Sequence, residues 1–259
     1  MDARTVIDLN CDLGEGFGAW TMGDDAALLG IVTSASVACG FHAGDPGTMR
    51  RACATAAEHG VAVGAHVGYR DLAGFGRRPM RVPAAELADE ITYQIAALEG
   101  FARAAGTRVR YVKPHGALYN TVAVDAEQAQ ALADAVHRYD PDLPVVGLAG
   151  SAGLRLAADR GLPVVAEAFA DRAYAPDATL APRSQPGAVL HEASAIVERA
   201  LTMLREGRVL AVDGTPVALR ADTVCVHGDT PGAVRIAAAL RDGLAAAGIE
   251  LRAFADVES

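Results

Sequence analysis

Ionisable side chains with catalytic chemistry occur where several short apolar runs of the chain end. The stretch VKPHGALYN, residues 112–120, places a lysine and a histidine at such a point. A lysine ammonium group stabilises negative charge, and a histidine transfers protons near neutral pH. We therefore predict that Lys113 and His115 are catalytic, and that Tyr119 and Asn120, which follow them, contact a substrate.

A second polar group lies on the first apolar run, residues 5–12. Asp8, Asn10 and Asp12 alternate with apolar residues, so they share one face of a strand. A strand in a parallel sheet is buried on both faces, and buried polar groups are costly unless they have partners. This pattern favours a functional group, with Asp12 as a catalytic residue and Asn10 as a substrate contact.

Polar side chains also follow most of the other apolar runs. We assign to substrate binding the five candidates His42, His66, Glu167, Arg172 and His227. A single residue in such a position can instead form a turn or cap a helix. Asp45 and Asp229 fit this alternative well, because each lies shortly before a proline near a predicted helix start.

Two long segments are expected to act as binding loops, because unstructured loops of this length are uncommon in compact domains unless they are functional. The first, residues 67–82, contains Arg77 and Arg78, whose guanidinium groups can each hold a carboxylate or a phosphate. The second, residues 169–189, contains Arg183. A solvated charged surface is the alternative for the arginine pair.

The elements that must position these residues are seven β-rich runs that alternate with Ala-rich amphipathic stretches. The runs cover residues 5–12, 34–40, 60–66, 108–114, 143–149, 162–169 and 223–229. Such alternation is typical of parallel βαβ units. We predict that residues 1–259 form a single (β/α) barrel of seven parallel strands, with the polar residues around its carboxyl-terminal rim.

Two local patterns refine this fold prediction. An open doubly wound sheet is the alternative, but GEGFG at residues 14–18 lacks the spacing of a dinucleotide-binding loop. Asp213-Gly214 lies between two alternating apolar runs and predicts a β-hairpin outside the barrel.

Composition excludes some partners. The formal charge of -9 and the pI of about 5.2 leave no basic surplus for nucleic acid. No apolar run approaches the length of a transmembrane helix, and we expect a cytoplasmic protein that does not bind membranes. Its four cysteines are far apart and are expected to be buried free thiols.

Six motifs together resemble one known family. The segments DLNCDLGEGFG, ACGFHAGDP, GAHVGYRDLAGFGRR, VKPHGALYN, EAFADRAY and VCVHGD occur in an order that resembles the LamB/YcsF family, the A subunits of 5-oxoprolinase. The resemblance covers essentially the whole chain. It implies a barrel related to the glycoside hydrolase and deacetylase-like barrels.

The resemblance also implies an activity. The chain would be the A component of a bacterial ATP-dependent 5-oxoprolinase that works with two partners, the B and C subunits. The complex would cleave 5-oxo-L-proline to L-glutamate while ATP, with magnesium, becomes ADP and phosphate. A lactam is an unreactive amide, and phosphorylation of its oxygen makes it a better electrophile.

The required chemistry fits the candidate residues. Lys113 and either Arg77 or Arg78 would neutralise phosphate or carboxylate charge, and Asp12 and His115 would transfer protons and position water. His42, His66 and His227 would complete the pocket.

Two alternatives stay open on the sequence alone. Asp12, His42 and His66 could hold a divalent metal for direct deacetylase-like amide hydrolysis. The barrel could also bind a ligand without catalysis.

Overall fold

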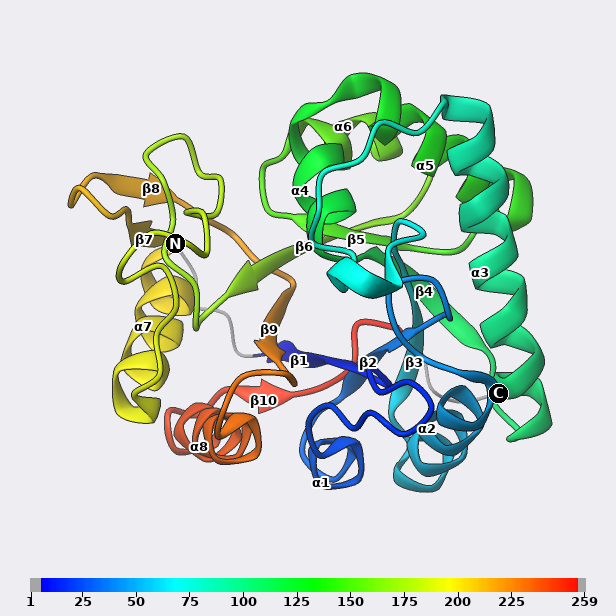
Figure 1. Ribbon diagram of the computed structural model, residues 1–259. Coiled ribbons are helices and arrows are strands. Elements are labelled where there is room, and N and C mark those ends of the chain that lie inside the picture. Colours follow the sequence, from blue (N-terminus) through cyan, green and yellow to red (C-terminus); the bar gives the residue numbers. More distant parts are fainter. Residues whose placement is uncertain (1–5, 256–259) are drawn as a thin grey trace.

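Seven parallel strands close on themselves in the computed structural model, which describes residues 6–255. The sheet runs in the order β1 to β6 and then β9, and β9 pairs with β1 to close the barrel (Figure 1). The strands are β1 Val6–Leu13, β2 Ser34–Ala38, β3 Ala62–Val67, β4 Val109–Pro114, β5 Val145–Leu148, β6 Val164–Phe169 and β9 Thr223–His227. All seven predicted strands, and the predicted barrel, are therefore confirmed.

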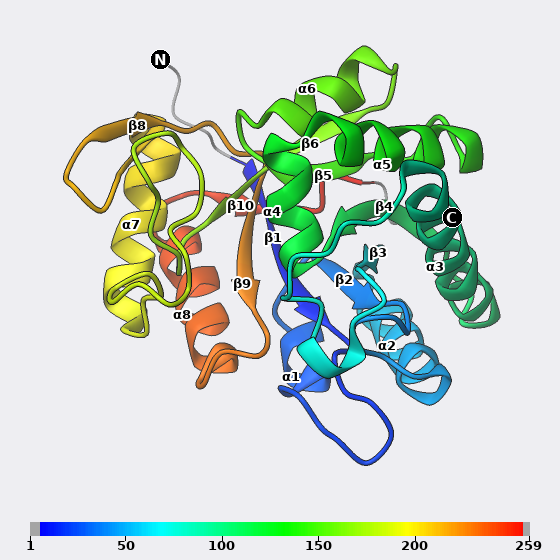
Figure 2. The same cartoon turned by 45° about the horizontal axis from the view of Figure 1, so that its top comes forward.

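Helices surround this barrel. They are α1 Asp25–Leu29, α2 Pro46–His59, α3 Ala84–Ala104, α4 Gly116–Val124, α5 Ala126–Tyr139, α6 Ala152–Asp159, α7 Ala193–Glu206 and α8 Ala233–Ala246, with a short 3₁₀ turn, η1, at Leu72–Gly74. Figure 2 shows α3, α5 and α6 on one side of the strands and α7 and α8 on the other. None of the helices within residues 6–255 has both the length and the apolar composition of a membrane-spanning segment.

The two predicted helix caps have different outcomes. Asp45 caps α2, because its Oδ1 accepts a hydrogen bond from the Thr48 backbone N–H at 2.9 Å and Pro46 opens the first turn. Asp229 does not cap α8, whose N-cap residue is Gly232. The carboxylate of Asp229 instead accepts a hydrogen bond from Arg77 at 2.7 Å, so a capping role for it is wrong.

Four further elements, α4, β7 Arg208–Leu210, β8 Pro216–Ala218 and β10 Glu250–Leu251, lie outside the regular βα repeat. The predicted hairpin forms from β7 and β8, which pair antiparallel beside α7 (Figure 1). The sequence patterns missed the helices α1 and α4 and the short strand β10, which pairs with the start of β1.

The alternation of β1 separates two environments. Its residues Leu9 and Cys11 join the large apolar core, while Asn10 and Asp12 belong to the buried polar residues. The Tyr111 ring of β4 packs so closely on Gly64 of β3 that a Cβ there would overlap it. The two faces of β1 thus differ, with apolar residues on one and buried polar residues on the other.

Candidate active site

A cavity opens at the carboxyl-terminal end of the barrel strands. Nine predicted site residues line it: Asp12, His66, Arg77, Lys113, His115, Tyr119, Asn120, Arg172 and His227. They come from several strands and from the loops that follow, as expected for an active site built on a parallel barrel. The segment Leu180–Arg183 also lines the cavity, so the second long loop reaches the site.

Four predicted residues do not line the cavity. Asn10 and Glu167 lie among the buried partners of Lys113. His42 is buried against His115, with ring centroids 3.7 Å apart and the rings nearly parallel. Arg78 is mostly exposed and pairs with the buried carboxylate of Asp71, so the structure does not bring it into this site.

Lys113 is the only lysine in the chain and is almost completely buried. Its Nζ lies 2.8 Å from Asp12 Oδ1 and 2.7 Å from Glu167 Oε1, and it donates to Asn10 Oδ1 at 3.1 Å. Burial alone would lower the pKa of Lys113, but the adjacent carboxylates, Asp12 above all, raise it well above its usual value. The amine is therefore a fixed positive charge.

Asp12 connects this lysine to a group of histidines. Its Oδ2 lies 3.4 Å from His66 Nε2, while its Oδ1 contacts Lys113. Burial would raise the pKa of Asp12, but His66 and Lys113 outweigh that effect and hold it well below its usual value. Asp12 is thus an ionised carboxylate at the edge of the cavity.

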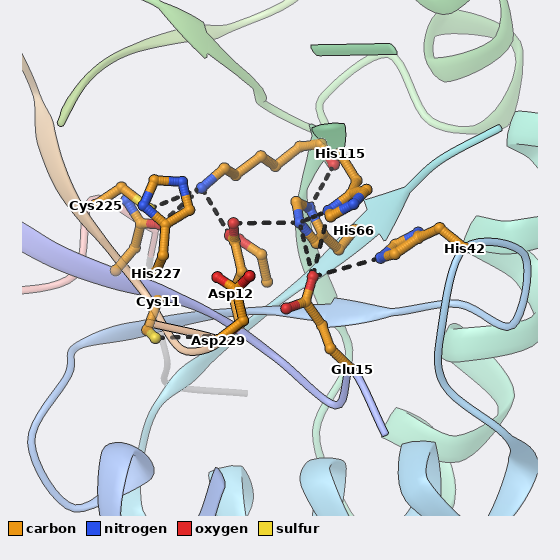
Figure 3. Close-up of polar contacts among 12 residues, drawn as sticks. Cys11, Asp12, Glu15, His42, His66, His115, Cys225, His227 and Asp229 are labelled. Atoms are coloured by element: carbon orange, nitrogen blue, oxygen red, sulfur yellow. Dashed lines mark hydrogen bonds and ion pairs between the residues drawn. The ribbon is translucent and has the colours of Figure 1, made fainter. Parts of the chain in front are cut away.

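The histidine group surrounds Glu15, a residue that the sequence patterns did not single out. Figure 3 shows its carboxylate facing His42, His66 and His115, with Oε1 at 3.6, 3.9 and 3.3 Å from their nearest ring nitrogens. One donor atom from each of these four buried residues lies within 4.8 Å of all the others, so the group could bind a metal ion. One signal in the sequence could have found Glu15, since it follows β1 closely at the same rim as Asp12.

Burial and local contacts shift the pKa values of Glu15, His42 and His115. Burial lowers the pKa of His42 to about 3, with a further contribution from His115. Burial likewise lowers the pKa of His115. It would raise the pKa of Glu15, but contacts with His115 and His42 hold that pKa well below its usual value. The ionised carboxylate of Glu15 therefore faces the imidazoles of His42 and His115, whose lowered pKa values favour the neutral form.

His227 and Asp171 form another polar contact at the cavity. His227 Nδ1 is 2.8 Å from Asp171 Oδ2, and its ring stacks on Phe169 with centroids 5.3 Å apart. Burial would raise the pKa of Asp171, but His227 holds it below its usual value. The contact fixes the ring of His227 at the cavity wall, where its other nitrogen can meet a ligand.

Arginines supply positive charge at the mouth. Arg172 is buried and donates to the carbonyl of Ala181 at 2.7 Å. Burial, followed by the charges of Arg183 and Arg77, lowers its pKa to about 10, so it remains a cation. Together with Lys113, these three arginines make the cavity suited to an anionic ligand.

Comparisons with known proteins agree with one another. A model of the LamB/YcsF family matches residues 7–259. The A subunit of 5-oxoprolinase from Mycobacterium avium (strain 104) is 63% identical over 248 residues, which cover 96% of this chain and 98% of that protein. A crystal structure of the lactam utilization protein from Thermus thermophilus is 48% identical with a TM-score of 0.91, covering 96% of this chain and 100% of that one.

A more distant likeness concerns the fold alone. The catalytic domain of a peptidoglycan N-acetylglucosamine deacetylase from Eubacterium rectale superposes with a TM-score of 0.50 at 12% identity, covering 99% of this chain and 91% of that one. The barrel therefore has the architecture that the motifs implied.

Proposed function

Because the chain belongs to the LamB/YcsF family, we propose that it is the A component of an ATP-dependent 5-oxoprolinase and opens the lactam of 5-oxo-L-proline to give L-glutamate. The observation that carries this proposal is one cavity that combines Lys113, the acid-base residues Asp12 and His115, and arginines at its mouth. A lactam that bears a carboxylate needs all three kinds of group.

ATP makes the amide reactive in this proposal. Its γ-phosphoryl group moves to the lactam oxygen and ADP leaves, after which water attacks the ring carbon. The C–N bond breaks, the nitrogen takes up a proton, and a second water releases phosphate. Magnesium would accompany ATP, as in other phosphoryl transfers.

The residues of the cavity have defined roles in this reaction. Lys113 neutralises the negative charge of the phosphoryl group on the lactam oxygen, where a fixed cation in a buried site is most effective. Asp12 and His115 position water and transfer protons. Arg77, Arg172 and Arg183 hold the carboxylate or phosphate of the ligand, and His227, Tyr119 and Asn120 contact its remainder.

The B and C subunits would supply the phosphorylation. The sequence contains no Walker-type loop, and the relative from Mycobacterium avium bears the name of one component of a larger enzyme. We place the docking surface at the cavity mouth, around Arg77 and Arg183, because an activated intermediate must be kept from bulk water. A cytoplasmic location accords with four cysteines that are free and buried.

Reconstitution tests this function. The chain is mixed with its B and C partners, ATP, magnesium and 5-oxoproline, and glutamate release is followed. We expect turnover only when ATP and all three chains are present. Robust turnover by this chain alone, with or without ATP, would contradict the proposal.

A second candidate function is metal-dependent amide hydrolysis without ATP, and the group of Glu15 with three histidines favours it. Turnover by the isolated chain that needs a divalent metal but no ATP would support that candidate. Substrate binding without turnover, even with both partners, would instead indicate a ligand-binding barrel.

A further inference from the structure

We propose that Glu15, His66 and His115, with His42 as the fourth donor, bind one divalent transition-metal ion of the zinc class. The ATP-coupled reaction proposed above does not require this ion, so the inference goes beyond it. With the ion bound, both ring nitrogens of His115 are occupied, and proton transfer in that reaction would depend on Asp12. The four residues follow or end β1, β2, β3 and β4, which are consecutive strands of the barrel. Their side chains converge from four separate parts of the sequence on one point.

His66 and His115 face each other through one ring nitrogen each. His66 Nδ1 lies 3.1 Å from the Lys113 carbonyl oxygen, and His115 Nε2 lies 2.8 Å from that of Phe75. A carbonyl oxygen only accepts hydrogen bonds, so each of these nitrogens must carry the hydrogen. In neutral imidazoles the opposite nitrogens, His66 Nε2 and His115 Nδ1, then present lone pairs.

Those two lone pairs face each other at 3.0 Å. When both rings are neutral and oriented in this way, neither facing nitrogen carries a hydrogen to donate. The contact is therefore repulsive unless a cation lies against both nitrogens. The Glu15 carboxylate, 3.3 Å from His115 Nδ1, brings a third electron-rich atom to the same point. Three such atoms arranged around one point are typical of a metal site.

A proton shared between the rings is the competing explanation. It would make one ring an imidazolium and would leave both ring nitrogens of His42 without a partner, whereas a metal ion would also bind one of those nitrogens. A metal ion needs the neutral ring in both residues.

Unpartnered atoms point the same way. Within residues 6–255, Glu15 Oε1 and both ring nitrogens of His42 are buried and lack a hydrogen-bond partner. Buried polar atoms are rarely left in this condition. A ligand bond would satisfy Glu15 Oε1 and one nitrogen of His42.

The spacing fits a small ion. Donor atoms around a tetrahedral zinc, at about 2.0–2.1 Å from the metal, lie about 3.3 Å apart. The separations are 3.0 Å for His66 and His115, and 3.3, 3.6 and 3.9 Å from Glu15 Oε1 to His115, His42 and His66. All four donors lie within 4.8 Å of one another, so shifts of a few tenths of an ångström suffice for Glu15, His66 and His115, and His42 must move farther.

The donor set also selects the kind of metal. Three imidazoles with one carboxylate suit zinc, cobalt or nickel, whereas magnesium and calcium prefer oxygen ligands. Asp12, which the sequence left as an alternative metal ligand with His42 and His66, pairs with Lys113 instead. It stands next to the ion, 3.4 Å from His66 Nε2, where it can hold a metal-bound ligand.

Metal binding by the isolated chain tests the inference. The wild-type protein is purified without chelator, and its metal content is measured by mass spectrometry. After removal of the metal, it is titrated separately with Zn²⁺ and with Co²⁺, whose visible absorption reports nitrogen and oxygen ligands. We expect one ion per chain. A wild-type chain that binds no stoichiometric ion of either metal would overturn the inference by itself.

Variants locate the ion. Glu15→Gln and His115→Gln should each weaken Co²⁺ affinity by more than about a hundredfold, because even residues outside a ligand set alter metal affinity by about 10–100-fold. His59→Gln, an exposed histidine at the end of α2, is the matched control and should bind as the wild type does. Wild-type affinity in both ligand variants would place the ion elsewhere and overturn the assignment. Because no ATP, substrate or partner is present, failure here is distinct from failure of the proposed reaction.

Discussion

Lys113 Nζ and Asp12 Oδ1 meet at 2.8 Å across the interior of the barrel, although β4 and β1 are separated in the sheet by β2 and β3. Glu167, from β6, reaches the same amine at 2.7 Å. One buried cation therefore neutralises carboxylates from two other strands. The stability of the barrel and the chemistry of its site depend on the same three side chains.

Replacing Lys113 with methionine should destabilise the fold. The substitution leaves Asp12 and Glu167 as buried carboxylates without their cation, and breaking such a pair costs about 3–5 kcal/mol. Denaturant unfolding at pH 7 measures the free energy. Arg205→Met, at an exposed arginine of α7, is the control and should change it by less than about 0.5 kcal/mol. A loss below about 1 kcal/mol for Lys113→Met would show that the carboxylates do not need the amine.

Asp12→Asn should lower turnover of the reconstituted enzyme by about a hundredfold or more, the usual contribution of a positioned acid or base. The same is expected for His115→Ala. Glutamate release and thermal unfolding are measured together, with the exposed Asp142→Asn as a control. If Asp12→Asn unfolds early yet turns over normally, the residue is structural.

Arg183→Gln should raise KM for 5-oxoproline by about tenfold or more, because a hydrogen bond to a charged group contributes about 1.5–3 kcal/mol. Arg183 lines the cavity and is only partly buried, so its loss should leave the fold intact. The control is Arg78→Gln, since Arg78 pairs with Asp71 outside the cavity. Equal effects of the two substitutions on KM would contradict the assigned anion contact.

Asp8 should make stability depend on pH. Its carboxylate accepts hydrogen bonds from Thr33 and Ser34, each at 2.6 Å, and from Thr223. Burial nevertheless raises the pKa of Asp8 from 3.8 to about 6. The Asp8 carboxyl therefore binds its proton more tightly in the folded state than in the unfolded state. Its ionisation lowers the free energy of unfolding as pH rises from about 4 through 6.

The Asp8→Asn variant isolates this effect. A tenfold change in proton affinity corresponds to about 1.4 kcal/mol, so the free energy of unfolding of the variant relative to the wild type should rise by about 3 kcal/mol between about pH 4 and pH 7. Denaturant unfolding across this range measures the difference. A difference that stays constant with pH would mean that the pKa of Asp8 is the same in both states.

The strands and the rim could be predicted from the sequence because both follow from local patterns. Alternation along β1 placed Asn10 and Asp12 on the inner face, and the βα repeat brought Lys113 and His115 to the same end. Glu15 escaped prediction because it lies two residues past the end of β1, where strand alternation no longer determines direction.

Loop geometry explains the other differences. Arg77 and Arg78 are adjacent, yet Arg77 lines the cavity and Arg78 bonds to Asp71. The sequence alone does not show which of the two arginines faces the cavity, because that depends on the buried carboxylate of Asp71, which the fold brings near Arg78. The same holds for Asp229, whose partner Arg77 is 152 residues away.

The single lysine also provides a chemical reporter. Reagents that acylate primary amines have one side chain in this protein to modify, and that side chain is 1% exposed. Its labelling therefore requires the amine to leave Asp12 and Glu167. The rate of acylation at Lys113, read by mass spectrometry, would then measure how often these ion pairs break under native conditions, without any engineered probe.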